Sequence, residues 1–314
     1  MNSNISVIIP TFNGQKLLEK HLPSVAKMLD PGDEILVVDD ASTDSTVEWL
    51  QQMIPEYAKK DIHLHILVHA KNQRFAAAVN TGVEAAQHSY VFLLNNDVSP
   101  LSKDIKKTLL SWFSDPAFFA VGCAEVNEDS PQAQVHGRGT GGWVRGLFMH
   151  WYDPDQSSNR TLWTAGGSML FDTAKYRELG GMDTLFYPAY EEDRDLSYRA
   201  LKHGWKIAFE PKAHVLHQHE TTNSTIFGQR KMQIASWKNQ YLFVWKNCTD
   251  FSMLLQHILW LPYHVVVSGA RSNWTATRGF FQALGQLGQA LQRRLSVKKL
   301  WKLSDQQVLS QFEN

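Results

Sequence analysis

Short apolar runs rich in β-branched residues alternate with segments of helical periodicity along the first hundred residues. Near-continuous apolar strands separated by helices are typical of a parallel sheet that is covered on both faces. The sequence therefore predicts an α/β fold with a mostly parallel central sheet flanked by helices. Strands are expected at 6–10, 34–40, 64–69 and 90–97, and helices near 15–29, 45–54 and 74–87.

Polar side chains stand at the ends of three of these predicted strands. In open α/β sheets, ligands bind at the carboxyl ends of the strands, so these side chains are candidates for a binding site. Ser45 followed by Glu48 has the spacing of a capping box, which places the end of the second strand in a loop before a helix. The strand-end residues are Thr11 and Asn13, Asp39 and Asp40, and Asn95, Asn96 and Asp97.

Asp97 is the strongest metal candidate among them. An apolar run precedes Asn95-Asn96-Asp97, which puts a carboxylate at the tip of a buried strand. Mg²⁺ or Mn²⁺ bridging a diphosphate takes few protein oxygens and completes its coordination with phosphate and water, so one carboxylate can be enough. Taken alone, however, an Asn-Asp pair at a strand end is more often a turn than a metal site.

Four carboxylates occur within five positions at 191–195, directly before a predicted helix. An acidic helix N-terminus that complements the helix dipole is the simpler interpretation. It explains the density poorly, because clustered carboxylates repel one another unless a cation, a hydroxyl or raised pKa values make use of them. A general base acting on a sugar hydroxyl needs such a carboxylate in a partly desolvated site.

His217 follows an apparent short strand and is a third candidate. A single histidine in such a place is usually structural, and His214 and His219 lie beside it. The sequence therefore leaves open which histidine, if any, is a ligand.

The region from about 115 to 165 is rich in Gly, Trp and His and shows no clear period. We expect a long loop over a site there. Regular patterns return at 163–171, which predicts a strand, and a helix is expected from about 172.

The last quarter of the chain is basic. Residues 251–304 contain no Asp or Glu and seven Arg or Lys. Residues 251–270 are uncharged, but Gln256, His257, Pro262 and His264 interrupt them, which favours a buried or interfacial segment over a membrane-spanning one. Beyond it, apolar residues at helical spacing suit either an anionic membrane surface or packing on the rest of the protein. These are Phe280, Leu284, Leu287, Leu291 and Leu295.

Whole-chain composition excludes some classes of function. Lys plus Arg and Asp plus Glu both total 31, so the molecule has no net field to attract nucleic acid. Cys123 and Cys248 are too far apart for a redox motif or a metal knuckle. The N-terminal residues show no secretory signal, so we expect a cytoplasmic protein, with the inner face of the membrane as a further location.

Seven motifs in order resemble the family 2 inverting glycosyltransferases with the A-type nucleotide-sugar fold, in particular bacterial rhamnosyltransferase-like members. The resemblance covers about two-thirds of the chain and implies a Rossmann-like catalytic domain at 1–225 with a helical C-terminal region at 226–314. The motifs are VIIPTFNG (7–14), VVDDASTD (37–44), NQRFAAAVNTG (72–82), FLLNND (92–97), TAGGSMLF (164–171), EEDRDLSYRALKHGWKI (191–207) and AHVLH (213–217).

The resemblance also implies roles for individual residues. Thr11 and Asn13 would lie beside the nucleotide, and Asp40, with Asp39 adjacent, would contact its base or ribose. Arg74 stands where many members have Gly, and members with Arg there use it near the base or the phosphates. Asn95 takes the place of the first Asp in the usual Asp-x-Asp motif.

The remaining roles concern the metal, the donor and the reaction. Asp97 and His217 would hold the divalent cation, Mg²⁺ or Mn²⁺. Gly166 and Gly167 would let the backbone approach the donor sugar or acceptor. Within Glu192-Asp193, Asp193 would be the general base.

The implied reaction moves a sugar from a nucleoside diphosphate donor to a glycan or lipid-linked acceptor, with inversion, in the synthesis of a bacterial surface polysaccharide or glycolipid. A nucleotidyltransferase would need a Gly-rich basic loop after the first strand, and residues 10–20 lack one. A catalytically silent sugar-nucleotide or membrane-binding module is the other alternative. Intact Asp97, Asp193 and His217 argue against it.

Overall fold

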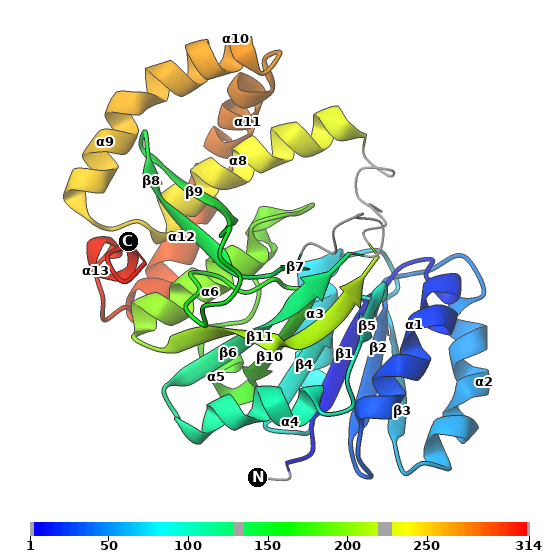
Figure 1. Ribbon diagram of the computed structural model, residues 1–314. Helices are drawn as coiled ribbons and strands as arrows, with labels where there is room; N and C mark the ends of the chain where they lie inside the picture. Colours follow the sequence, from blue (N-terminus) through cyan, green and yellow to red (C-terminus); the bar gives the residue numbers. More distant parts are fainter. Residues whose placement is uncertain (1–2, 128–134, 219–227, 313–314) are drawn as a thin grey trace.

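The computed structural model describes residues 3–127, 135–218 and 228–312. Within these residues the strands form a nine-stranded sheet in the order β3-β2-β1-β4-β10-β6-β11-β5, with β7 paired to β6, and a separate hairpin of β8 and β9 (Figure 1). The strands are β1 Ser6–Thr11, β2 Glu34–Asp39, β3 His63–Val68, β4 Tyr90–Leu94, β5 Val98–Pro100, β6 Phe118–Val126, β7 Val135–His136, β8 Gly139–Val144, β9 Leu147–Tyr152, β10 Ser168–Asp172 and β11 Lys206–His217.

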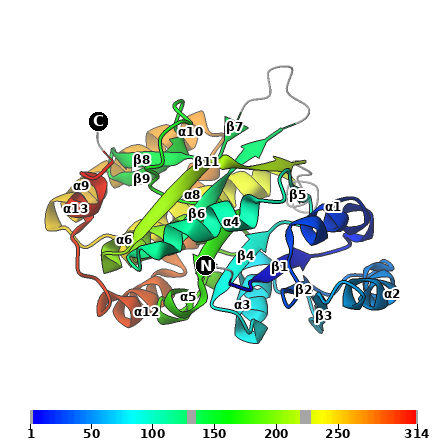
Figure 2. The same ribbon diagram turned by 60° about the horizontal axis from the view of Figure 1, so that its bottom comes forward.

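Helices cover both faces of the large sheet, as Figure 2 shows from a second direction. Those of the first two-thirds of the chain are α1 Gln15–Met28, α2 Thr46–Ala58, α3 Phe75–Ala85, α4 Ile105–Leu110, α5 Thr173–Glu178 and α6 Glu192–His203, with 3₁₀ turns η1 Ser111–Ser114 and η2 Thr184–Phe186. Alternate residues of β1 show why its sequence is continuously apolar: Val7 and Ile9 pack with the α1 side of the core, and Ile8 packs with α3.

The predicted α/β class with a mostly parallel sheet is confirmed. Strand pairs β1–β2, β2–β3, β1–β4 and β6–β11 are parallel. Antiparallel β10 lies between β4 and β6, and β5 pairs antiparallel with β11. The first four predicted strands and three predicted helices all occur, with ends shifted by a few residues.

The predicted capping box is wrong in detail. Ser45 does occupy the position before α2, but its side chain forms no cap bond. Asp44 caps the first turn instead, because its Oδ1 accepts a hydrogen bond from the Thr46 backbone amide at 3.1 Å. Asp carboxylates and Ser hydroxyls compete for the same unpaired amides at a helix start.

The expectation of a loop from 115 to 165 is also wrong. Strand β6 occupies a central position in the sheet, and β8 and β9 pair from Gly139–Tyr152 to Val144–Leu147. The glycines of β8 interrupt the alternation of apolar and polar residues by which a strand is recognised in a sequence. A Cβ on Gly141 would lie 2.4 Å from the Met149 carbonyl oxygen, so close packing across the hairpin requires glycine there.

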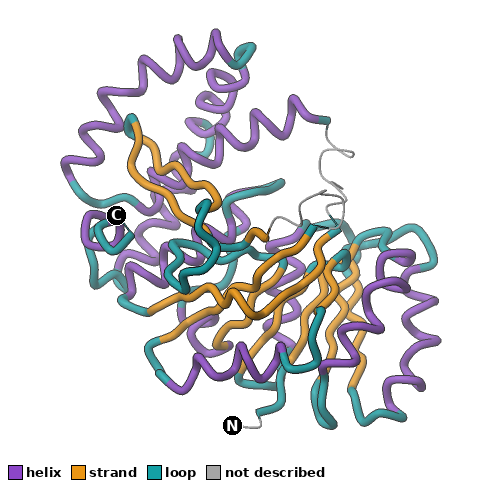
Figure 3. The backbone as a smooth tube through the Cα atoms, in the orientation of Figure 1, coloured by secondary structure: helices purple, strands orange, loops and turns teal. Residues whose placement is uncertain are grey.

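The C-terminal region is helical, as predicted (Figure 3). It contains α8 Gln229–Asn247, α9 Phe251–Pro262, the π-helical η3 Tyr263–Ser268, α10 Gly269–Arg271, α11 Thr275–Leu284, α12 Leu287–Lys298 and α13 Asp305–Leu309. The apolar spacing at 280–295 does not form one stripe, because the helix breaks at Gly285-Gln286. Buried residues of α8 belong to the same apolar cluster as those of α6 and β9.

Candidate functional site

Backbone and side-chain contacts join the predicted site residues at the carboxyl edge of the sheet. Thr11 Oγ1 accepts from Asn96 Nδ2 at 2.9 Å, which links the ends of β1 and β4. The Asn95 amide donates to the Gly167 carbonyl at 2.9 Å. The Gly166 amide in turn donates to Asp193 Oδ2 at 3.1 Å. The predicted diphosphate motif and the predicted base are therefore parts of one continuous site.

Glycine is required where these segments meet. A Cβ on Gly167 would lie 2.4 Å from Asn95 Nδ2, and one on Gly166 would lie 3.2 Å from Asp193 Cβ. The first distance is too short for any side chain, so Gly167 lets Asn95 pack against the backbone before β10. As a result, Asn95 and Asp193 both lie next to the Gly166-Gly167 pair.

The residues predicted to lie beside the nucleotide differ in their hydrogen bonds to the rest of the protein. Asn13, with a positive φ of 50°, accepts from the Thr43 amide through Oδ1 at 2.7 Å, which ties the loop after β1 to the loop after β2. Asp39 is fully buried, and its Oδ2 accepts from the Ser42 amide at 2.9 Å. Its Oδ1 is buried without a hydrogen-bond partner among the described residues.

Asp40 holds a turn of the backbone. Its two oxygens accept from the amides of Gln73 and Arg74, each at 2.7 Å, and Oδ1 also contacts His69 Nδ1 at 2.8 Å. With both oxygens engaged, Asp40 is built into the start of α3. Of the two adjacent aspartates, Asp39 has the oxygen that a ligand could satisfy.

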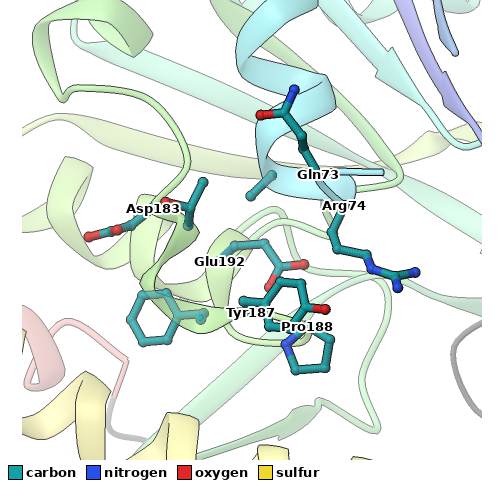
Figure 4. A pocket seen from close by; sticks show the side chains of 9 residues that line it. Gln73, Arg74, Asp183, Tyr187, Pro188 and Glu192 are labelled. Atoms are coloured by element: carbon teal, nitrogen blue, oxygen red, sulfur yellow. The ribbon is translucent and has the colours of Figure 1, made fainter. Parts of the chain in front are cut away.

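Arg74 occupies a backbone conformation, φ 73° and ψ 176°, that is essentially restricted to glycine. Such a conformation costs on the order of 1–3 kcal/mol for another residue and persists only where surrounding contacts impose it. Here Asp40 imposes it. The guanidinium lies 5.9 Å from the Tyr187 ring centroid, at the edge of a small pocket that Gln73, Pro188 and Glu192 also line (Figure 4).

Asp97 and His217 are brought together, as the metal prediction requires. His217 Nε2 lies 3.4 Å from Asp97 Oδ1, and His217 Nδ1 lies 2.9 Å from Glu125 Oε2. Burial by itself would lower the His217 pKa, but its contacts with Asp97 and Glu125 outweigh burial and raise the pKa to about 10. Ser168 Oγ donates to the other Glu125 oxygen at 2.6 Å and fixes that carboxylate.

This arrangement fits a divalent cation that the protein holds only in part. Glu125 on Nδ1 leaves His217 Nε2 directed at Asp97, and a cation that bound at Nε2 would displace the Nε2 proton while Glu125 kept the proton on Nδ1. Among the described residues, no group of three or more His, Cys, Asp or Glu side chains is placed to hold a metal by itself. Asp97 and His217 would therefore supply two ligands, and the diphosphate and water would supply the others.

The choice among the neighbouring histidines follows from the strand. His214 lies three positions from His217 on β11, so an alternating strand directs it to the opposite face. His219 lies outside the described residues.

The acidic segment at 191–195 divides into different environments. Asp195 is completely buried and binds Arg199 at 2.7 Å and Lys246 at 2.7 Å, so it is structural. Glu192 is also buried. Burial, followed by the negative charge of Asp193, raises its pKa to about 8, so Glu192 is largely protonated at neutral pH. A protonated Glu192 therefore places no second negative charge beside Asp193.

A chain of contacts orients Asp193. Arg194 Nη1 donates to Asp193 Oδ1 at 3.0 Å, while its Nε donates to His150 Nδ1 at 3.0 Å. Because His150 Nδ1 accepts, Nε2 carries the ring proton and donates to Glu191 at 3.3 Å. The Arg194 guanidinium also stacks 4.6 Å from the Trp163 ring centroid. Asp193 is thus held by Gly166 on one oxygen and by Arg194 on the other.

Sequence reasoning missed Glu125, His150 and Arg194. Glu125 and His150 fall in the region that was expected to be a loop. A signal for Glu125 existed, because it is the one charged residue in the otherwise apolar run at 118–126, and a charge in a buried strand requires a partner. His150 has no such signal in the sequence, because only its contacts with Glu191 and Arg194 in the folded protein reveal it.

Comparisons with known proteins place this geometry in a family. The profile described as Glycosyl transferase family 2 matches residues 6–174. TuaG of Bacillus subtilis, a glycosyltransferase whose name links it to teichuronic acid biosynthesis, is 38% identical over 93 residues, which are 30% of this chain and 35% of TuaG. The O-antigen chain rhamnosyltransferase RfbN of Salmonella typhimurium is 23% identical over 219 residues, covering 69% of this chain and 67% of RfbN.

Two solved structures share the fold at low sequence identity. The mannosyltransferase PcManGT from Pyrobaculum calidifontis, in complex with GDP-Man and Mn²⁺, has a TM-score of 0.59 at 17% identity, with 96% of this chain and 82% of that chain covered. TarS 1-349 of S. aureus, in complex with UDP-GlcNAc, has a TM-score of 0.58 at 16% identity, with 95% and 84% covered. The chain spans about a third of TuaG, the relative with 38% identity. With its family profile matched over more than half its length, this chain belongs to Glycosyl transferase family 2.

Proposed function

We propose that this protein is an inverting, metal-dependent glycosyltransferase that moves a hexose or rhamnose from a nucleoside diphosphate to a hydroxyl of a glycan or lipid-linked acceptor. The observation that carries the proposal is the link from Asn95 through Gly167 and Gly166 to Asp193. It places a carboxylate beside the diphosphate motif, as a single displacement requires.

In the proposed mechanism, Asp193 accepts the proton of the acceptor hydroxyl as that oxygen attacks the anomeric carbon. Arg194 and the Gly166 amide fix the carboxylate, so that one geometry is presented to the hydroxyl. The bond from the anomeric carbon to the diphosphate breaks on the opposite side, and configuration inverts. A bound divalent cation supplies Lewis-acid stabilisation of the leaving diphosphate.

Other residues bind and orient the donor in this proposal. Asp39 Oδ1, buried without a hydrogen-bond partner among the described residues, accepts from the nucleoside. Arg74 lies near the phosphates or base, where its charge favours the donor. Thr11, Asn13 and Asn95 shape the nucleotide side of the site. His217 as a nitrogen ligand favours Mn²⁺ over Mg²⁺, which prefers oxygen.

Calorimetric titration tests the donor half of the proposal. UDP, dTDP and GDP would each be titrated with and without Mn²⁺ into the protein and into the Asp97→Ala and Asp104→Ala variants. Asp104 is an exposed carboxylate whose side chain makes no cap bond at α4, so it is a matched control. We expect one nucleotide to bind with Mn²⁺, and Asp97→Ala alone to abolish this binding. Absence of binding under every condition would favour a silent module.

The proposed reaction itself is tested by measuring sugar transfer. With the donor identified, the anomeric configuration of the product by NMR reports inversion or retention. Asp193→Asn keeps an acceptor for the Gly166 amide but cannot take a proton, so we expect kcat to fall by about 10²–10⁴ while nucleotide affinity is kept. Retained configuration, or full activity of Asp193→Asn, would contradict the proposed mechanism.

A further inference from the structure

The helical stretch α9–η3–α10 presents an apolar face to solvent. Five large apolar side chains at helical spacing on one side are 44% to 80% exposed, namely Phe251, Leu255, Ile258, Leu259 and Val266. We call these five residues the α9 face. A helix of a soluble protein normally directs such a stripe into the core.

The opposite side of the same helical stretch is buried and includes two histidines. His257 Nδ1 contacts the Gly146 carbonyl at 2.6 Å, and His264 Nε2 contacts the Arg145 carbonyl at 2.7 Å. Both histidines pack on the tip of the β8–β9 hairpin, with their pKa values lowered by burial. Met253, Leu254 and Leu261 of α9 pack against the apolar core, so the exposed α9 face is a second apolar side of this helix. An exposed apolar stripe of this length is typical of a surface that binds a membrane or another protein.

Neighbouring elements extend the apolar character. Trp274 and Phe281 of the α10–α11 segment are more than half exposed, and Leu295 on α12 is 73% exposed. At the hairpin tip, the Arg145 guanidinium lies 5.7 Å from the Trp260 ring centroid and donates to the Tyr263 hydroxyl. Trp and Tyr are enriched where an apolar phase meets water, because each has an apolar ring and a polar tip.

The charged side chains within this C-terminal segment are all basic. No Asp or Glu occurs from 251 to 304. Arg271, Arg278, Lys298 and Lys299 are exposed, and none of these four forms an ion pair with the described residues. Basic residues near an apolar stripe attract the anionic headgroups of a lipid bilayer.

We propose that the α9 face is a docking surface for an anionic lipid bilayer. The helix lies flat in the headgroup region, with its apolar side toward the acyl chains and the basic residues among the headgroups. A second copy of this chain fits less well, because a symmetric contact would bring the same positive charges together.

The structure also favours lying on the membrane over crossing it. Phe251–Arg271 is long and apolar enough to span a bilayer by length and composition, and only 17% of its apolar window is buried. A spanning helix, however, would carry His257, His264 and their hairpin partners into the hydrocarbon. Polar groups there are costly.

Vesicle flotation tests the proposal without donor or metal, so its outcome is independent of the proposed transferase activity. The protein would be mixed with vesicles of phosphatidylcholine alone and with vesicles that also contain phosphatidylglycerol. A triple variant, Leu255→Ser, Ile258→Ser and Leu259→Ser, removes most of the α9 face. Its control carries Ile54→Ser, Val68→Ser and Leu101→Ser, which are exposed apolar residues elsewhere. Thermal unfolding checks that both variants fold.

We expect binding to the phosphatidylglycerol vesicles, reduced at least about tenfold in the α9-face variant and unchanged in its control, since the variant replaces three large apolar side chains that would be buried among the lipids. Arg271→Gln with Arg278→Gln should weaken binding severalfold, and Lys59→Gln with Lys60→Gln should not. Lack of vesicle binding, or equal binding of both triple variants, would overturn the proposal. So would a lipid-free dimer, seen by light scattering, that only the α9-face variant loses.

Discussion

At the scale of single residues, the site depends on carboxylates of identical chemistry placed in different surroundings. Asp193 is paired with Arg194, Glu192 is kept protonated by burial, and Asp195 is paired with Arg199 and Lys246. The helix-dipole interpretation of this segment accounts for none of these differences. Burial and specific partners assign each carboxylate a separate task.

His150 should influence catalysis through Arg194. His150→Leu removes the acceptor for Arg194 Nε, so the guanidinium and the Asp193 carboxylate lose a fixed orientation, and kcat should fall about ten- to a hundredfold with KM for the donor little changed. His150→Asn keeps an acceptor near the Nδ1 position and should recover part of the activity. Steady-state kinetics of both variants check this, and equal losses would indicate a purely structural role.

Glu192 should make stability fall as pH rises. The unfolded chain releases this proton near pH 4.5 and the folded protein near pH 8, so the folded state binds more protons between these values. Stability therefore declines across that window as pH increases. Glu192→Gln should have a Tm at least about 2 °C above the wild type at pH 8 and no advantage at pH 5. Glu84→Gln, at an exposed site, is the control for calorimetric scans.

At the scale of elements, the sequence predicts strands and helices that have a regular apolar pattern. It misses elements that depend on contacts between distant segments. β1, β2 and β4 are continuous apolar runs because both faces of each strand are buried, so their positions follow from local pattern. The hairpin β8–β9 depends instead on glycines that allow close packing, and its contacts come from residues far away in sequence. Motif order could therefore nominate Asp97, Asp193 and His217 as candidates, but it could not nominate His150.

Lys246 of α8 should be essential for stability because it ties that helix to helix α6, which carries the acidic segment. Its ammonium lies 2.7 Å from Asp195 and 2.7 Å from Asp183, and all three side chains are buried. Lys246→Met preserves the shape but leaves two buried carboxylates short of a cation, at a cost of about 3–5 kcal/mol. Chemical denaturation measures this loss. Lys59→Met, which breaks an exposed ion pair, should cost less than about 1 kcal/mol.

At the scale of the whole molecule, the division into 1–225 and 226–314 stays a prediction, and the packing argues for interdependence. Phe243 of α8 stacks 4.6 Å from Phe148 of the hairpin, and Asn239 donates to the backbone carbonyls of Phe186, Ala189 and Tyr190. The segment that leads into the acidic motif is thus held by the C-terminal region.

Truncation tests this interdependence. A chain ending at residue 225 would expose the apolar surface that α8 covers, including the contacts of the fully buried Tyr241 and Leu242. We expect such a chain to be insoluble or to lack a cooperative unfolding transition. A soluble 1–225 fragment that binds nucleotide as the full chain does would instead establish an autonomous catalytic domain.

The β8–β9 hairpin contacts helix α9, on the side opposite the α9 face, and also contacts the acidic motif. Gly146 at its tip contacts His257, and His150 contacts Glu191. Beyond the turn at Arg145 and Gly146, strand β9 leads from Leu147 to His150 in three extended steps, a span of about 10 Å. With the α9 face on a bilayer, the hairpin becomes a spacer that sets the height of the reaction above the lipid. Acceptors would then be selected by how far their hydroxyl stands from the membrane, so a hydroxyl close to the headgroups would be out of reach of Asp193.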